Sequence, residues 1–468
     1  MLRLSAAIAS ALLGACLSAG LAQAPGTPVR LPGVRPAKAT FLNASGARMY
    51  LGKLPFRNIG VNMPDLLHQF LTGDEAGAQK ALADAALAGA RFARCIGCPQ
   101  TVAEVGDSQA NSARWVDAFE RMAAAANSAG LGIVPVLAGS PAAYAQFAAG
   151  SGAPDAGVAG ACSPGTRANA LILGYVSRLV DLHRADTRIL LWEVGDELNR
   201  LAEVPAPPEA GTHPPTPEQV HNYLAQVAVA IRSVDKNHLV SSGNGQLSPW
   251  AWHQRQPAEA PAGPPPQDTF PQYEEMLGYY NPQPIGVISV HISPVRPGDA
   301  VPRWIDPDPL HSYALPWSAY AANANGRPLF LGRFSEPAVV KGIEQKASWT
   351  AETVRRLVEQ EPAPLAAIGD WEPANSASAD TVSPTLTPTI VRGLADANAT
   401  IRQAILDEAI GLGLIRAPKQ PAVPKKPRLP VPPLTPPAGP GAVSPPVKPP
   451  VGAAAPPTPP PSRTGGGT

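Results

Sequence analysis

Short apolar segments alternate along this chain with longer segments of helical period, and eight such units can be counted between residues 39 and 415. Most of the short segments are continuous apolar runs, which is the pattern of parallel strands covered on both faces. The longer segments carry apolar residues at three- and four-residue steps, which indicates amphipathic helices. The expected strands are 57–62, 90–96, 132–138, 188–195, 238–242, 286–292, 328–334 and 366–371. The clearest expected helices are 75–87, 114–128, 167–185, 216–234, 350–361 and 401–410.

Eight strand-helix units predict an α/β protein with a (β/α)8 TIM barrel over residues 39–415. A doubly wound sheet of eight strands is the alternative, but it does not explain why functional-looking residues follow many different strands. Two proline-rich loops are enlarged, 201–215 after the fourth strand and 249–271 after the fifth. Loops that follow barrel strands build the catalytic face, so we expect both loops to shape a cleft there.

The first residues have the pattern of a secretory signal peptide, expected over 1–24. Arg3 precedes an apolar run at 4–13 that is too short to span a bilayer. Two processing sites compete. One is the small-x-small pattern Ala22-Gln23-Ala24, which is weakened by Pro25 directly after it. The other is Leu13-Gly14-Ala15-Cys16, which resembles the box before the lipidated cysteine of bacterial lipoproteins. The protein is therefore expected to be exported, periplasmic or extracellular, with membrane attachment only through a lipid anchor at Cys16.

Composition separates the expected barrel from its flanks. The chain has 58 prolines and 42 glycines, and the prolines concentrate in a linker at 25–38 and in the tail 416–468. The tail cannot bury a core and is expected to be disordered and extended, as a spacer or a recognition element. Lysine and arginine number 37 against 36 acidic residues, a formal charge of +1, so nucleic acid is not an expected partner.

Three cysteines remain beyond the signal peptide: Cys95, Cys98 and Cys162. A zinc site would need a fourth ligand, and none is found nearby in the sequence. A redox pair would be expected at a helix start in a thioredoxin-like pattern. In an exported protein the pattern favours a loop disulfide with one spare thiol. No metal or organic cofactor is indicated.

The segment Trp192-Glu193-Val194-Gly195-Asp196-Glu197 ends an apolar strand in two adjacent carboxylates, where a barrel displays its catalytic groups. It resembles the fourth-strand motif of glycoside hydrolase clan A, particularly family 5, the cellulase family. The resemblance implies that Glu197 is the general acid/base. Asp196 stands where the family has an asparagine that donates to a sugar hydroxyl, and a carboxylate cannot donate in that way.

Other segments follow in the order of that family, so the resemblance covers about residues 39–412. The run 56–62 looks like its first strand, and 89–94 looks like its second, ending in the arginine that braces the nucleophile, Arg94. His291 matches the histidine of the sixth strand, although Ser293 replaces the usual tyrosine. Trp371 matches the tryptophan that floors the sugar site. The implied ligand is a polysaccharide or oligosaccharide.

The seventh strand departs from the family pattern, because its nucleophilic glutamate aligns with Arg333 in the run 327–336. Retaining glycosidases need two carboxyl groups about 5 to 5.5 Å apart, and a guanidinium cannot attack the sugar. Arg333 is expected to pair with Glu197 and to keep it ionised. Three alternatives would rescue catalysis: Glu336 as a displaced nucleophile, an inverting arrangement, or a role for Glu372.

Two functional hypotheses remain. The first is a glycosidase with Glu197 and Glu336 as catalytic residues and with Arg94, Asp196, His291 and Trp371 shaping the sugar site. The second is an inactive barrel that binds a glycan or an envelope partner, with Arg333 in a salt-bridged network. Plainer interpretations stand beside them: an acidic helix start at the paired carboxylates, a packed His291, a core Trp371, and a structural role carried by the tail.

Overall fold

The computed structural model describes residues 40–150, 157–203, 214–256, 266–292, 314–334, 343–360, 362–371 and 381–415. These residues lie within the first of two units, Met1–Arg416 and Ala417–Thr468. The expected signal peptide, the linker and the tail lie outside the described residues and stay predictions. None of the helices in the described part of the chain is long and apolar enough to cross a membrane.

The strands form a closed parallel barrel. Its segments are β4 (Asn58–Asn62), β5 (Phe92–Ile96), β6 (Gly132–Val136), β7 (Leu191–Glu193), β8 (Leu239–Ser241), β9 (Asn244–Gly245), β10 (Ile288–Ile292), β11 (Leu329–Phe334) and β12 (Leu365–Ile368). They pair in the order β8-β7-β6-β5-β4-β12-β11-β10-β9. The two ends of this order are consecutive pieces of one stretch of chain, and Ser241 also bridges Val287 just before β10. The sheet therefore closes on itself, which confirms the (β/α)8 barrel.

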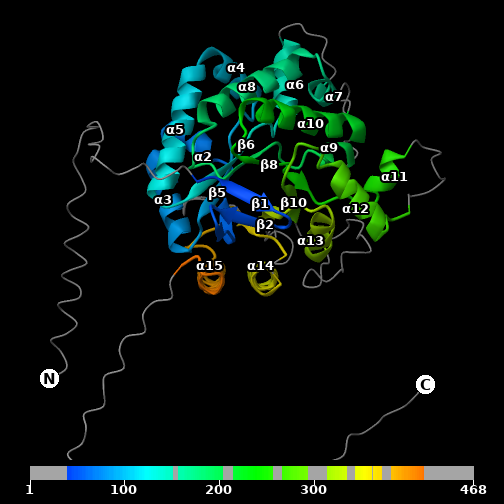
Figure 1. Cartoon of the computed structure of the whole chain (residues 1–468). Coiled ribbons are helices and arrows are strands. Elements are labelled where there is room, and N and C mark those ends of the chain that lie inside the picture. The colour runs from blue at the N-terminus through cyan, green and yellow to red at the C-terminus, as the bar shows by residue number, and fades with distance from the viewer. Residues whose placement is uncertain are drawn as a thin grey trace, which may run out of the picture. The chain divides into compact units, whose positions relative to one another are not determined.

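Long helices surround this sheet (Figure 1). They are α3 (Glu75–Leu87), α5 (Ser112–Ser128), α8 (Arg167–His183), α10 (Pro217–Val234), α13 (Ala314–Ala324), α14 (Ile343–Glu359) and α15 (Pro388–Gly411). Helix α10 shows why they form: Thr216 and Gln219 make a capping box and Pro217 occupies the first turn. Its buried residues recur at three- and four-residue steps, so one face packs on the sheet.

Shorter helices lie in the connections, most of them after the carboxyl ends of strands. They are α2 (Leu66–Thr72), α4 (Val102–Ala110), α6 (Pro141–Gly150), α7 (Gly157–Ala161), α9 (Arg200–Glu203), α11 (Ala251–Arg255) and α12 (Phe270–Tyr279). The last expected strand is divided at Gly369, whose φ is 42°, into β12 and β13 (Asp370–Trp371). Strand β13 pairs with β14 (Thr381–Val382).

A small antiparallel sheet precedes the barrel, and sequence patterning did not predict it. It consists of β1 (Leu42–Ser45), β2 (Arg48–Leu51) and β3 (Leu54–Pro55). Leu42, Met49 and Phe56 pack with the inward-facing strand residues Phe92, Val134, Leu191, Val287, Phe330 and Leu365. A second, larger apolar cluster fills the space between sheet and helices. The interior cluster makes the barrel a packed support for the side chains at the other ends of its strands.

Candidate active site

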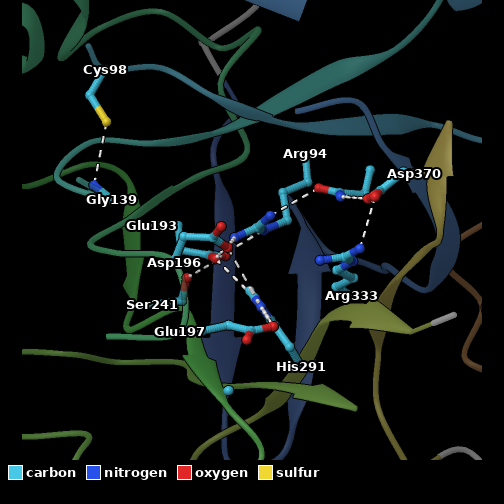
Figure 2. A network of polar contacts seen from close by, with 12 residues as sticks. Arg94, Cys98, Gly139, Glu193, Asp196, Glu197, Ser241, His291, Arg333 and Asp370 are labelled. Carbon is cyan, nitrogen blue, oxygen red and sulfur yellow. Dashed lines mark hydrogen bonds and ion pairs between the residues drawn. The ribbon is translucent and has the colours of Figure 1, made fainter. Parts of the chain in front are cut away.

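Polar side chains gather at the carboxyl ends of neighbouring strands. The strand register places Asn62 opposite Arg94, and His291 opposite Arg333. Glu193 ends β7, and Asp196 and Glu197 follow it in the connection to α9. Figure 2 shows Arg94, Glu193, Asp196, Glu197 and His291 directed toward one another, and Arg333 next to Asp370. The structure therefore brings Arg94, Asp196, Glu197, His291 and Arg333 of the predicted site into one region.

Arg94 is the centre of this network, although its side chain is only 1% exposed. Its Nε and Nη2 donate to Glu193 Oε1 at 3.0 and 2.7 Å, and Nη2 also donates to Asp196 Oδ1 at 2.6 Å. Its Nη1 donates to Asn62 Oδ1 at 2.9 Å. All three guanidinium nitrogens are thus engaged. The arginine holds two carboxylates from β7 and its following loop against β4 and β5.

The carboxylates around Arg94 stay ionised. Burial alone would raise the pKa of Glu193, but the charge of Arg94 and the nearby His291 leave that pKa below its ordinary value. The pKa of Asp196 is lowered in the same way, because Arg94 outweighs burial. Ser241 Oγ donates to the second Glu193 oxygen at 3.3 Å. Glu193 is therefore a fully buried, ionised residue that orients Arg94.

Glu197 has a backbone φ of 55°, which places a non-glycine residue in the left-handed region. Its Oε1 lies 3.3 Å from His291 Nδ1 and its Oε2 lies 3.4 Å from Arg200 Nη1. Burial raises the pKa of Glu197, but the hydrogen bond to His291 and its charge lower that pKa by more, so the net pKa is below the ordinary value. A quarter of the side chain remains exposed. Glu197 is thus an accessible carboxylate that is held ionised.

His291 lies between carboxylates. Its Nε2 is 3.5 Å from Glu193 Oε1, and its Nδ1 is 3.6 Å from Asp196 Oδ1. Burial and the charge of Arg94 lower the pKa of His291, but its interactions with the carboxylates of Glu193, Glu197 and Asp196 outweigh them, and the net pKa is raised. A Cβ on Gly332 would lie 2.6 Å from His291 Nε2, so a glycine on β11 leaves room for the ring.

Arg333 pairs with a different carboxylate from the expected one. Its Nη2 donates to Asp370 Oδ2 at 2.8 Å, and the other Asp370 oxygen accepts from Asn62 Nδ2 at 2.8 Å. The expectation that Arg333 pairs with Glu197 is wrong. Asp370, at the end of the neighbouring eighth strand, lies next to the Arg333 guanidinium, whereas Glu197 is contacted by His291 and Arg200.

Trp371 does not form an exposed floor. Its side chain is 1% exposed, belongs to the cluster between sheet and helices, and donates from Nε1 to the Ala81 carbonyl oxygen of α3 at 3.1 Å. Side chains alternate in direction along a strand, so with Asp370 facing the site, Trp371 faces the helices. Sugar rings stack only on exposed aromatic faces, so the expected role of Trp371 is wrong in this conformation.

The expected disulfide is also absent. Cys95, Cys98 and Cys162 are all free and buried. Cys95 Sγ lies on the helix-facing side of β5, 3.9 Å from Met122 Sδ. Cys98 Sγ accepts from the backbone N–H of Gly139 at 3.3 Å. Burial raises the pKa of each thiol to about 12, so these cysteines are protonated packing residues.

Several predicted features lie outside the described residues. Glu336 and Glu372 are among them, as is Ser293, so their placement stays a prediction. Parts of the loops 201–215 and 249–271 are also outside. In the described part of the second loop, Trp252 Nε1 donates to Glu275 Oε2 at 2.9 Å. On α13, Trp317 packs edge-on against Phe270.

Sequence reasoning missed three residues that complete the network: Glu193, Asn62 and Asp370. Each is a polar residue at the end of an otherwise apolar strand, and that position was the available indication. Among the described residues, Glu120, His183 and Asp186 alone could hold a metal ion. Arg188 already donates to both carboxylates there at 2.6 to 2.8 Å, so this cluster is an ion-pair network at the other end of β7.

Comparison with known proteins identifies the fold. No family model and no curated protein matches the sequence. Solved structures do match: the glycoside hydrolase family 5 mannosidase from Rhizomucor miehei has a TM-score of 0.54 at 12% identity and covers 79% of this chain and all of its own. The endo-1,4-beta-mannanase from Rhizomucor miehei has a TM-score of 0.55 at 16% identity, with 77% of this chain and 99% of its own covered.

A third match is the endo-1,4-beta-D-mannanase from Thermotoga petrophila, with a TM-score of 0.54 at 14% identity, covering 73% of this chain and 99% of its own. These matches confirm the resemblance at the level of the fold. The chain has the (β/α)8 barrel fold of these mannanases.

Proposed function

We propose that this protein binds a polysaccharide or oligosaccharide at the carboxyl ends of its barrel strands and does not cleave it by the retaining mechanism. One observation carries the proposal. Arg333 stands on β11 beside His291 and is ion-paired with Asp370, and the sequence resemblance assigns the family nucleophile to its position. A guanidinium has no lone pair available to attack an anomeric carbon.

The state of Glu197 supports the same conclusion. A general acid at neutral pH needs a raised pKa, so that it carries a proton to give to the leaving oxygen. The pKa of Glu197 is instead held below its ordinary value by His291. A carboxylate in that state can accept hydrogen bonds from sugar hydroxyl groups, as can Asp196 beside it.

Hydrolysis is the second candidate, with Glu197 as acid/base and Glu336 as nucleophile. The left-handed backbone of Glu197 favours it, because strained non-glycine residues concentrate at functional sites. Glu197 is also a quarter exposed at the mouth of the barrel. The expected signal peptide would place either activity outside the cytoplasm, in the periplasm or beyond it.

Release of reducing ends from β-1,4-mannan and related polysaccharides, together with ligand affinity, distinguishes the two candidates. Binding without release by the wild-type chain is the expected result. Release that Glu197→Gln abolishes, and that the control Glu359→Gln on the outer face of α14 leaves intact, would establish hydrolysis instead. The expected outcome for Arg333→Glu is a gain of cleavage, if the altered nucleophile is the only missing part.

A further inference from the structure

The hydrogen-bond donors and acceptors of the candidate site differ in how many partners the protein gives them. Every carboxylate has a donor: Glu193 has Arg94 and Ser241, Asp370 has Asn62 and Arg333, Asp196 has Arg94, and Glu197 has His291 and Arg200. Among the cations, Arg94 donates through all three of its nitrogens. Each carboxylate of the site therefore already has at least one donor from the protein.

Arg333, in contrast to Arg94, has donors that no group in the described part of the protein uses. Among the described residues its guanidinium contacts only Asp370, through Nη2, and its buried Nε has no hydrogen-bond partner. Its side chain is 31% exposed. Figure 2 shows part of the guanidinium turned away from Asp370, to the side on which His291 and Glu197 lie. Its charge also lowers the pKa of Asp196, so it acts on the centre of the site.

We infer that the sugar site accepts an acidic glycan that carries hexuronate carboxylates, and that Arg333 binds the carboxylate. This inference rests on the proposed glycan-binding function. A guanidinium with unused N–H donors is matched best by a carboxylate, because charge-assisted hydrogen bonds are about twice as strong as neutral ones. A neutral sugar offers the guanidinium only uncharged hydroxyl and ether oxygens.

The net charge of the site permits this ligand. Arg94, Arg200 and Arg333 face Glu193, Asp196, Glu197 and Asp370, and His291, whose pKa is raised, adds positive charge as it protonates. With His291 protonated, four cations face four anions. A ligand carboxylate next to Arg333 therefore enters a balanced site whose most exposed paired cations are Arg200 and Arg333.

The test is a comparison of two ligands by isothermal titration of the full chain. β-1,4-Mannuronate hexamers and β-1,4-mannohexaose share backbone and linkage and differ at C6, where a carboxylate replaces a hydroxymethyl group. The mannuronate is expected to bind at least tenfold more tightly at low salt. That preference should shrink as salt screens the charges. Galacturonate hexamers and their methyl esters form a second matched pair, in which only the charge changes.

Variants assign the effect to the residue. Arg333→Gln should lower affinity for the uronate by at least tenfold and leave affinity for the neutral hexamer within twofold, and Arg333→Lys should recover part of the loss. The control Arg355→Gln removes an equal charge from the outer face of α14 and should change neither affinity. Thermal melts establish that each variant is folded.

Three results would overturn the inference. Equal affinity for the acidic and neutral hexamers would exclude a carboxylate preference, and an unchanged uronate affinity in Arg333→Gln would exclude the residue. Both leave glycan binding itself in place. A folded protein that binds neither pair of ligands would refute the proposed function together with the inference.

Discussion

The network is tested most sharply by removing its central guanidinium. Arg94→Met removes that group with little change in side-chain length. In the wild type, Arg94 makes four hydrogen bonds of 2.6 to 3.0 Å to Glu193, Asp196 and Asn62. The variant leaves Glu193, whose side chain is 0% exposed, as a buried charge without its cation. Breaking a buried pair in this way costs about 3 to 5 kcal/mol.

The loss should depend on pH, and its sign follows from the lowered pKa of Glu193. In the wild type, this carboxyl contributes stability above its unfolded pKa of about 4.3, and the contribution is lost as pH falls through the lower folded pKa. Without Arg94, burial raises the same pKa, so stability falls as pH rises above about 4.3. The stability difference between the two proteins should therefore widen from pH 4 to pH 7.

Urea unfolding at pH 4, 5, 6 and 7 measures this difference. The double variant Arg94→Met/Glu193→Gln serves as the control, because it removes the stranded charge and should recover part of the loss. A stability loss below about 1 kcal/mol at pH 7 would refute the reasoning, since that is the scale of an exposed ion pair. A loss that does not change with pH would refute the electrostatic part of it.

Three further predictions concern the support of the site. Burial raises the pKa of Glu203 to about 8, above its unfolded value, so the wild-type free energy of unfolding should fall from about pH 5 to pH 8. Glu203→Gln should reduce the slope of this fall by up to about 1.4 kcal/mol per pH unit in urea unfolding, and parallel pH profiles of the two proteins would contradict it. Gly243→Ala should destabilise by 2 kcal/mol or more in urea, because φ is 73° and a Cβ would lie 1.9 Å from the Gly195 carbonyl oxygen; a loss under about 0.5 kcal/mol would show that the loop relaxes. Asn398→Ala should lower the free energy of unfolding by about 1 to 3 kcal/mol, because the Asn398 amide hydrogen-bonds both the N–H and the carbonyl of Ile59 on β4. Hydrogen exchange at the Ile59 amide should accelerate in the variant, and unchanged protection would contradict this role.

The strands were predictable because the physical cause of each is local. A short apolar run without helical period is typical of a strand that is buried on both faces, and each barrel strand lies in or next to the expected range. The small antiparallel sheet β1–β3 was not predicted because the buried apolar residues in and next to it, Leu42, Met49 and Phe56, are spaced too widely to form an apolar run.

The candidate site was predictable only in part, because Glu193, Asn62 and Asp370 were missed and the pairing of Arg333 was not foreseen. Arg94, His291 and Arg333 were found through the family resemblance, which assigns each of them to a barrel strand. Which carboxylate an arginine meets depends on barrel closure and on the direction of each side chain. Arg333 therefore meets Asp370, and Trp371, one residue later, faces the helices.

The central claim is that the site binds a glycan without cleaving it, and a single-turnover incubation tests it most directly. The full chain is held in excess over an oligosaccharide that titration has shown to bind, and the mass of the sugar is followed for many hours. The account predicts a sugar of unchanged mass, recovered from the complex. Shorter products formed by the wild type and lost in Glu197→Gln would contradict it, and would make Arg333 a residue of a working active site.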